Sequence, residues 1–309
     1  MYKAFRLGLL LGLTAMLSAC AGLAPRTTAE LPTDLPPNRL LTDLPFHAQD
    51  AYQCGPAALS MMLGQRGIEI APAQLTGRVY LPERKGSLQV EMVAAAREQG
   101  LLVYPLAGKL DAILRELDDG NAVLVMQNLA FDWYPQWHYA VAVGYDLNTR
   151  ELILHSGLNA RQREPFSVFM RTWDRAERWA RVALPPERIP ATAEPLPFLA
   201  AAADLEQVGQ TDSASKAYQA AAERWPDQPA ALLGLGNIAW HNGQQAEAIE
   251  HFSELVRRFP GYSAGWNNLA TGMQEMGCDT AAQQVRSCAA ASLEDSQAAA
   301  TDCLIPVCR

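Results

Sequence analysis

The length, composition and charge of the chain restrict what it can be. It has 309 residues, which exceeds a typical single domain of about 100–200 residues, so two domains and an export segment are expected. Hydrophobic residues make up 49% of the chain and charged residues 19%, as in a soluble globular protein and unlike a disordered one. The net charge of −8 and the scattered Lys and Arg side chains argue against a nucleic-acid partner, because no basic stripe is available to neutralise phosphates.

The first twenty residues have the pattern of a bacterial export signal. Lys3 and Arg6 supply a positive end, and residues 7–17 form an apolar stretch that is too short to span a bilayer. The stretch ends in Leu17-Ser18-Ala19-Cys20, which resembles the lipobox of bacterial lipoproteins, whose Cys is lipidated after the bond before it is cut. The resemblance implies a signal peptide over residues 1–19 and lipidation of Cys20. The alternative is an ordinary secretory signal with an accidental Cys.

The residues that follow the lipobox indicate where the lipoprotein would be held. Ala21 stands where an inner-membrane retention signal of Gram-negative lipoproteins would usually have Asp. The resemblance therefore implies a lipid anchor in the outer membrane of the cell envelope, which we expect to face the periplasm. Residues 24–37 are rich in Pro and Thr and lack periodicity, which is typical of a flexible spacer. We expect a lipid-anchored tether over residues 20–43.

The six cysteines divide by their position in the sequence. Two stand apart in the N-terminal part, whereas the other four gather near the C-terminus: Cys278, Cys288, Cys303 and Cys308. Export makes disulfides possible, and four cysteines permit three pairings, so two disulfides are expected. A metal site is the alternative, but these spacings lack the close pairs of zinc-binding motifs. We expect no metal and no cofactor, since the sequence also lacks a Gly-rich phosphate loop and an HExxH motif.

Helical and strand patterns mix between residues 44 and 185. Apolar spacing predicts helices over residues 56–65, 87–99 and 109–118, and an amphipathic packing helix over residues 167–182. Short runs rich in Val, Leu, Ile and Tyr predict strands over residues 101–106, 121–127, 138–145 and 151–155. Asp146 and Asn148 favour a turn, so the last two strands are expected to form an antiparallel hairpin. The pattern predicts an α+β domain over residues 44–185, with helices first and the sheet later.

A Pro-rich segment separates this domain from an Ala-rich one. Prolines recur between residues 185 and 197 too densely for a helix or a central strand. We interpret residues 186–197 as an interdomain linker.

Beyond the linker the sequence repeats itself every 34 residues. This interval separates three pairs of similar residues and a set of glycines: Pro226 and Pro260, Tyr218 and Phe252, Ala214 and Ala248, and Gly209, Gly243 and Gly277. The pattern resembles tetratricopeptide repeats, in which two helices per unit pack small residues against large ones. The resemblance implies an all-α domain of three units over residues 198–294, which would bind a protein partner. A Cys-containing tail, residues 295–309, follows.

Cys54 is a candidate for nucleophilic chemistry. It stands at the start of a predicted helix, just before Gly55 and Pro56, and Pro suits a first helical turn. Amide groups at a helix N-terminus present partial positive charge, which lowers the pKa of a thiol and favours the reactive thiolate. The alternative is that a lone Cys on an apolar helix is a small buried hydrophobe.

A thiol nucleophile needs an imidazole within hydrogen-bond reach, and the sequence has five histidines. His47 precedes the Cys in a loop, and His241 and His251 lie in the repeats. This leaves His138 and His155 on the predicted hairpin. His138 opens a strand, so its ring is free to face a groove. The alternative is a satisfied residue at a strand end.

Taken together, these motifs resemble a known family. The motifs are Gln49, then Cys54-Gly55-Pro56-Ala57-Ala58-Leu59, and later His138-Tyr139-Ala140-Val141-Ala142-Val143-Gly144. In this order they are similar to the bacteriocin-processing (double-glycine leader) cysteine peptidases of the papain-like class. The resemblance covers residues 44–157 and implies a papain-like α+β fold, in which a helix with the nucleophile packs on an antiparallel sheet with the base. It implies that Cys54 is the nucleophile and His138 the general base.

The same resemblance implies two further roles. Gln49 maps to the family's oxyanion-stabilising glutamine, whose side-chain amide donates to the negative oxygen of the tetrahedral intermediate, and Gln53 is the alternative. The family usually has an Asp in an Asp-Pro pair after the next strand, whereas this protein has Ser156 at the matching position. A Ser can orient the imidazole by a neutral hydrogen bond but cannot stabilise an imidazolium by charge. His155 and Asn159 are the alternative partners.

Two functions are therefore considered. The first is a membrane-anchored cysteine peptidase that cleaves peptide or protein substrates, with the repeats binding the substrate or a protein partner. The second is a catalytically weak or inactive peptidase-like binding or scaffold lipoprotein of the cell envelope, which the missing carboxylate favours. Acyl or amide transfer by the same thiolate would use the same residues as the first. Trp133, Tyr134 and Trp137, just before His138, fit a substrate groove and a core equally well.

Overall fold

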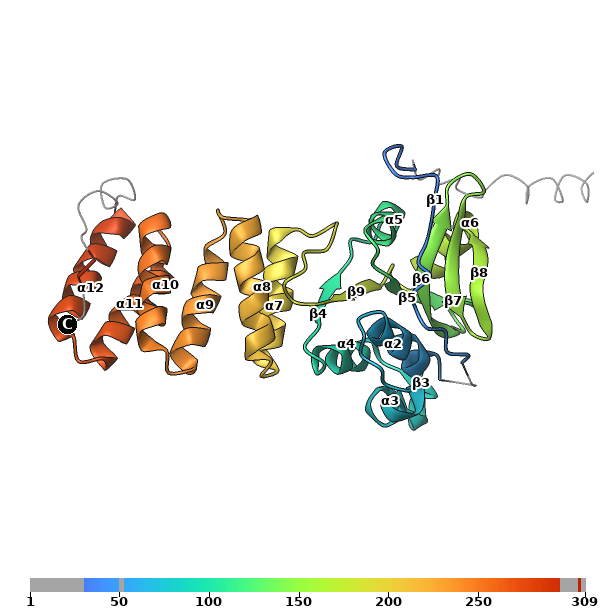
Figure 1. Ribbon diagram of the computed structural model, residues 1–309, viewed down its shortest axis with the longest axis horizontal. Coiled ribbons are helices and arrows are strands. Elements are labelled where there is room, and N and C mark those ends of the chain that lie inside the picture. The colour runs from blue at the N-terminus through green and yellow to red at the C-terminus, as the bar shows by residue number, and fades with distance from the viewer. Residues whose placement is uncertain (1–30, 50–52, 295–304, 307–309) are drawn as a thin grey trace, which may run out of the picture. The chain divides into compact units, whose positions relative to one another are not determined.

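The computed structural model describes residues 31–49, 53–294 and 305–306 (Figure 1). The expected export signal and Cys20 lie outside the described residues, as do Cys303 and Cys308. Within the described ranges, no helix combines the length and the apolar character that crossing a membrane requires. From Asp34 onward, the described residues belong to one unit, which contains a large sheet and a run of helical repeats.

The main sheet has seven strands, which are β1 (Asn38–Leu40), β4 (Leu102–Pro105), β5 (Val123–Asn128), β6 (Trp137–Asp146), β7 (Glu151–Ser156), β8 (Asn159–Pro165) and β9 (Ala180–Leu184). All neighbours pair antiparallel, in the order β4-β9-β5-β6-β7-β8, and β1 pairs with the end of β6. β6 is central because its small and β-branched residues are buried on both faces of the sheet. Strands β6 and β7 form the predicted hairpin.

Four helices pack on the two faces of this sheet, and they are α2 (Cys54–Gly64), α4 (Gln89–Arg97), α5 (Leu110–Asp118) and α6 (Phe166–Asp174). A further helix, α3 (Pro72–Val79), packs on α2 and α4. α2 is apolar on all sides and therefore buried, with Leu59 in one core cluster with Val141 of β6. Met126 of β5 packs against the same cluster, whereas the next residue, Gln127, contacts Thr172 of α6. Since side chains alternate along a strand, α2 and α6 lie on opposite faces.

Six consecutive helices follow the sheet domain, α7 (Pro195–Gln207), α8 (Thr211–Arg224), α9 (Pro229–His241), α10 (Gln245–Arg258), α11 (Ser263–Glu275) and α12 (Asp279–Glu294). Small residues on one helix meet large ones on the next: a Cβ atom added to Gly236 would lie 2.3 Å from the ring of Phe252. Gly209, Gly243 and Gly277 have φ values of 79°, 75° and 82° at the turns within each helix pair. The predicted α+β domain followed by all-α repeats is confirmed.

The predicted helix over residues 167–182 is wrong in its second half. Helix α6 ends at Asp174, and residues 180–184 form strand β9. Glu177 and Arg178 both have φ of 53°, which breaks the helix, and the indole of Trp173 donates a hydrogen bond to the carbonyl of Trp179 at 2.9 Å. The hydrogen bond between Trp173 and Trp179 therefore stabilises a tight turn within the segment for which one amphipathic helix was predicted.

Several elements have no counterpart among the predicted ones, among them β1, α3 and β8. β1 lies in the segment that the sequence assigns to the tether, and it pairs Leu40 with Gly144. A Cβ atom on Gly144 would lie 2.4 Å from the Arg39 carbonyl oxygen. The lack of a side chain at Gly144 therefore allows β1 to approach β6. The Pro- and Thr-rich composition of this segment did not indicate a strand.

The predicted linker is held against the first domain. The carboxylate of Glu116 accepts hydrogen bonds from the backbone of Ala191 and Thr192 at 3.3 and 2.8 Å. The hydroxyl of Tyr104 accepts one from the amide of Glu194 at 2.9 Å. Helix α7 begins at Pro195, within the last three residues assigned to the linker, because Pro suits the first helical positions.

The C-terminal cysteines are partly described. Cys278 and Cys288 are both disulfide-bonded, which agrees with the expected oxidation of this cluster. Within the described ranges, no group of three His, Cys, Asp or Glu side chains is arranged to hold a metal ion.

Adding a methyl group at the β1–β6 contact should destabilise the fold. We expect Gly144→Ala to lower the free energy of unfolding by about 1–3 kcal/mol, because overpacking forces backbone shifts. Gly77→Ala in α3 is the matched control, since no atom lies within 4 Å of an added Cβ there. It should leave stability unchanged or raise it by about 0.5–1 kcal/mol. Urea unfolding measures the free energy of unfolding of both variants. Equal changes in the two would show that β1 shifts to accommodate the added methyl group without loss of stability.

Candidate active site

A cavity of about 990 Å³ lies where the first turn of α2 meets the beginning of β6. Its lining includes three residues that the sequence singles out, Gln49, Cys54 and His138, together with Tyr139 and Gly157. Residues far apart in the sequence meet here because α2 packs directly on β6. The cavity is therefore lined by the predicted nucleophile, the predicted base and the predicted oxyanion-stabilising glutamine.

Cys54 is the first residue of α2, two residues before the predicted helix start. The amide of Ala57 donates to the carbonyl of Gln53 at 3.2 Å, which closes the first turn. Pro56 lies in that turn, where its missing N–H costs no hydrogen bond. Among the described cysteines, Cys54 is the free thiol, and it is partly buried at the cavity wall.

The protonation of Cys54 differs from the sequence expectation. Burial raises the pKa of the Cys54 thiol above its ordinary value, and this outweighs the amides of Tyr139, Gly55 and Cys54 itself, which lower the pKa. The helix N-terminus therefore acts in the expected direction, but desolvation is the larger effect. The resting residue is a thiol.

His138 is the second residue of β6, and its ring is tied to the neighbouring strand. Its Nε2 atom lies 2.9 Å from the hydroxyl oxygen of Ser156, at the end of β7. A neutral imidazole that donates Nε2–H to this hydroxyl keeps the lone pair of Nδ1 free to accept a proton. Burial lowers the pKa of His138, and it is the single cause of the shift, so the ring is neutral at rest.

Ser156, and neither of the two alternative residues, is the hydrogen-bond partner of the His138 imidazole. His155 points elsewhere: its Nδ1 accepts a hydrogen bond from the amide of Arg161 at 3.1 Å, and its ring meets Phe46 edge-on. The side chain of Asn159 donates to Gln162 at 3.3 Å. Of the three residues considered, Ser156 is the one that contacts His138.

Gln49 is buried and fixed between the two strands of the site. Its side-chain oxygen accepts a hydrogen bond from the amide of Gly157 at 3.1 Å, and its backbone amide donates to the Gly157 carbonyl at 3.1 Å. Its side-chain Nε2 reaches the Tyr139 carbonyl at only 3.5 Å, a long contact. Gln53 instead caps α2 without a side-chain hydrogen bond and does not line the cavity. Of the two glutamines, Gln49 is therefore the one that lines the cavity together with Cys54.

One wall of the cavity was not anticipated from the sequence. It is a small hairpin of β2 (Tyr80–Leu81) and β3 (Gly86–Ser87), which contributes Arg84, Lys85, Gly86 and Ser87 to the lining. A Cβ atom added to Gly55 would lie 2.1 Å from the hydroxyl of Ser87. The glycine that follows Cys54 therefore makes room for this hairpin.

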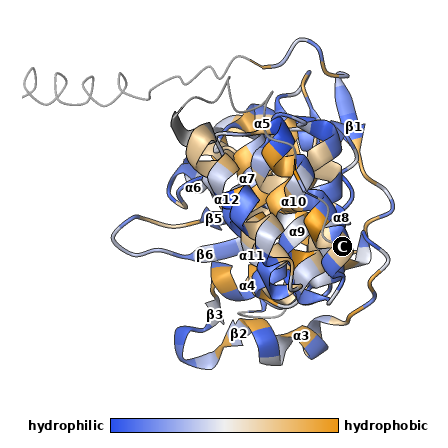
Figure 2. Ribbon diagram, turned by 90° about the vertical axis from the view of Figure 1, so that its left-hand side faces the viewer, coloured by the Kyte–Doolittle hydropathy of each residue, from blue (hydrophilic) through white to orange (hydrophobic). Residues whose placement is uncertain are grey.

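The aromatic residues before His138 are not core residues. The loop that joins β5 to β6 can be followed between these two strands in Figure 2. Trp133 and Tyr134 belong to this loop and are 81% and 71% exposed. Trp137 is 52% exposed and lines the cavity. The loop therefore forms part of the rim, which agrees with the groove interpretation for Trp137.

Comparisons with known proteins agree with this arrangement. The model of the Peptidase_C39 like family matches residues 41–180, and the model of the tetratricopeptide repeat matches residues 199–263. None of the curated proteins matches this sequence.

Among solved structures, the protein is similar to a C39-like peptidase from Bacillus anthracis, with 15% identity and a TM-score of 0.40, over 48% of this chain and 97% of that one. It is similar to the peptidase domain of Streptococcus ComA, a bifunctional ABC transporter of a quorum-sensing pathway, with 18% identity, a TM-score of 0.36, and coverage of 47% and 99%. A double glycine motif protease from an AMS/PCAT transporter, in complex with the leader peptide, has 16% identity, a TM-score of 0.34, and coverage of 47% and 92%. The protein thus contains a Peptidase_C39-like domain followed by tetratricopeptide repeats.

Proposed function

We propose that this protein is a cysteine peptidase that hydrolyses peptide bonds in peptide or protein substrates. One observation carries the proposal: Cys54 and His138 line the same cavity, and Ser156 holds Nε2 of His138 at 2.9 Å. A nucleophile, a base and a group that orients the base are the parts that thiol catalysis needs.

In the proposed first step, the sulfur of Cys54 attacks the carbonyl carbon of the scissile bond while Nδ1 of His138 takes the thiol proton. A sulfur–carbon bond forms, and the carbonyl electron pair moves to the oxygen. When this intermediate collapses, the carbon–nitrogen bond breaks, and the amine leaves with the proton from His138. A water molecule, deprotonated by His138, then hydrolyses the acyl-enzyme and restores the thiol.

Gln49 is proposed to stabilise the negative oxygen of the intermediate. Its oxygen is held by Gly157, so the amide nitrogen has a fixed direction, and its contact with the Tyr139 carbonyl is long at 3.5 Å. Exchanging a poor hydrogen bond for one to an oxyanion stabilises the transition state more than the ground state. The buried position strengthens this interaction, because the local dielectric constant is low.

The resting pair in this mechanism is a thiol and a neutral imidazole. Burial raises the pKa of Cys54 and lowers that of His138, so both shifts oppose a thiolate–imidazolium pair. Proton transfer therefore accompanies attack on the carbonyl carbon.

The setting of this activity is also part of the proposal. The cleft and its rim offer aromatic, basic and acidic contacts for a polypeptide, with Trp137, Arg84 and Glu177 in the lining. The repeats would bind the substrate or a protein partner, as helical repeats of this type do. On the sequence of the lipobox, we propose that Cys20 is lipidated and anchors the protein at the outer membrane, facing the periplasm.

The alternative function is a binding or scaffold lipoprotein with little or no turnover. Two observations favour it: a hydroxyl of Ser156 stands beside His138 where the resembling family has a carboxylate, and the pKa of Cys54 is raised. Such a protein would hold a peptide in the same cavity without cleaving it. This hypothesis fails if Cys54→Ala abolishes the biological function while folding and partner binding stay intact.

The nucleophile and base can be tested by substitution. Cys54→Ala should abolish cleavage of a mixed peptide pool followed by mass spectrometry, and His138→Ala should slow it by about 10²–10⁴-fold. His241→Ala, at an exposed position of α9, is the control and should not change the rate. Cleavage that persists without Cys54 would refute the proposal. So would a lack of cleavage combined with a Cys54 that resists alkylation.

If Ser156 orients His138, two substitutions of Ser156 should change kcat/KM in opposite directions. Ser156→Ala removes the hydrogen bond to His138 and should lower kcat/KM about tenfold, whereas Ser156→Asp should raise it about tenfold. A carboxylate at this position raises the pKa of His138 and stabilises the imidazolium that forms during attack. Circular dichroism and thermal unfolding check that both variants fold. A folded Ser156→Ala protein with unchanged kcat/KM would remove Ser156 from the mechanism.

The pH dependence of alkylation tests the resting protonation state. Because burial raises the pKa of Cys54, less thiolate is present at neutral pH than for a free thiol, whose pKa is about 8.5. The rate of iodoacetamide alkylation should therefore rise with a midpoint above that of N-acetylcysteine measured in the same buffers. A midpoint below about pH 7 would instead reveal a thiolate–imidazolium pair and contradict the neutral resting state.

A further inference from the structure

A second cavity, of about 350 Å³, lies between α4, strands β4 and β9, and helix α7. Two arginines line it, Arg97 of α4 and Arg181 of β9, together with one carboxylate, Asp204 of α7. Gln89 lines both this cavity and the cleft beside Cys54, so the two spaces adjoin.

Arg181 is a partly buried cation for which the described part of the protein provides no carboxylate partner. Its Nη1 donates a hydrogen bond to the neighbouring carbonyl of Ala180 at 2.8 Å, and its guanidinium lies 4.8 Å from the centre of the Trp179 ring. Burial, followed by repulsion from Arg97, lowers the pKa of Arg181 to about 10. Buried charges are normally paired, so this guanidinium has unused capacity for an anion.

Only part of the hydrogen-bonding capacity of the Arg97 guanidinium is used. One of its terminal nitrogens forms an ion pair with Asp204, but its Nε is fully buried without a hydrogen-bond partner. A guanidinium has five N–H donors, and a carboxylate with two oxygens matches its fork. The cavity is therefore lined by two positive charges and one negative charge.

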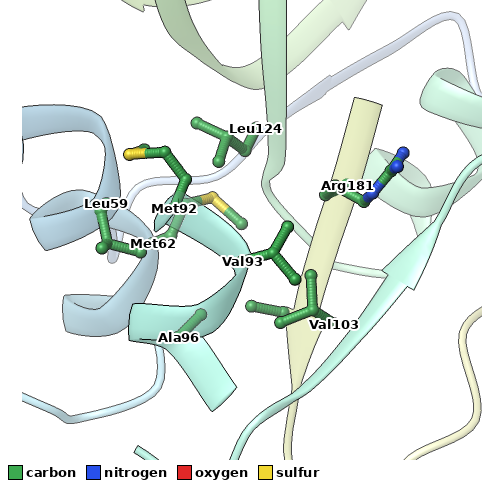
Figure 3. Close-up of a pocket in the computed structure, with 9 residues that line it drawn as sticks. Leu59, Met62, Met92, Val93, Ala96, Val103, Leu124 and Arg181 are labelled. Carbon is green, nitrogen blue, oxygen red and sulfur yellow. The ribbon is translucent and has the colours of Figure 1, made fainter. Parts of the chain in front are cut away.

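The remaining walls are apolar. Val93 and Val103 lie on one side, and the small residues Ala200 and Ala201 of α7 lie on another. Val93, Val103 and Arg181 also border a void of about 10 Å³ in the neighbouring core. In that region Arg181 extends its guanidinium away from the apolar side chains (Figure 3). An occupant with an apolar stem and a terminal carboxylate fits these surroundings.

We propose that this cavity binds a carboxylate of a peptide, either an acidic side chain or the peptide's own C-terminus, with the guanidinium groups of Arg181 and Arg97 as donors. Its position next to the cleft at Gln89 places such a group within reach of a polypeptide in the cleft. Binding of a carboxylate does not require turnover, so the inference stands apart from the proposed peptidase activity.

The test observes the arginine side chains directly. The full-length protein with Cys54→Ala is titrated with Ac-Ala-Glu-Ala-NH₂, Ac-Leu-Leu-OH, and their neutral counterparts with Gln or a C-terminal amide, while the Nε–Hε signals of Arg97 and Arg181 are followed by NMR. Saturable shifts of both signals are expected with the carboxylates and none with the neutral peptides. The first peptide reports an acidic side chain and the second a C-terminus.

Variants separate binding from a purely structural role. Arg181→Gln should weaken carboxylate binding about tenfold, the effect of one charge-assisted hydrogen bond. Arg171→Gln, which removes an exposed charge on α6, should not change it. Asp204→Asn removes the carboxylate that competes with the peptide carboxylate for Arg97, so it should tighten peptide binding. If Asp204 served only to hold α7 in place, its substitution would not tighten binding. This variant also provides a test if Arg181→Gln fails to fold.

Three outcomes would overturn the inference. The first is the absence of a saturable shift of both arginine signals with either carboxylate peptide. The second is an affinity that is unchanged in folded Arg181→Gln protein or that falls in Asp204→Asn protein. The third is inorganic phosphate binding more tightly than both carboxylate peptides, which would indicate a general anion site.

Discussion

The packing of helix α2 on strand β6 is the constraint on which the candidate site depends. The helix is apolar on every side, so burying it against the central strand is favourable whatever chemistry follows. Cys54 is the first residue of that helix, and His138 is the second residue of that strand. The hydrophobic core therefore brings a thiol and an imidazole to one cavity, although the two residues are far apart in the sequence. Gly55 makes this packing compatible with the hairpin that ends at Ser87.

The electrostatics of the cavity follow from the same burial. Desolvation penalises the charged forms of both Cys54 and His138, and burial is the single cause of the shift at His138. A hydroxyl at Ser156 keeps the ring in place without adding charge, whereas a carboxylate would also favour the imidazolium. The site is thus ordered in geometry but neutral at rest.

Much of this could be predicted from the sequence, for identifiable reasons. The 34-residue period indicated the repeats, and the motifs around Cys54 and His138 indicated the site, because both patterns are local. Strand β1 could not be predicted, since it depends on a space at Gly144 that exists only once β6 is folded. Strand β9 was hidden in an apparently helical stretch, because the turn at Glu177 and Arg178 needs two left-handed non-glycine residues. The direction of the thiol pKa was also missed, since burial is not visible in a motif.

The raised pKa of Cys54 has a consequence for the chemical durability of the site. Oxidants and disulfides react with thiolates far more readily than with thiols. An exposed thiol with a low pKa is therefore open to oxidation and to capture in mixed disulfides. A buried thiol that remains protonated resists both fates. The desolvation that raises the pKa of Cys54 thus also lowers the susceptibility of its sulfur to oxidation.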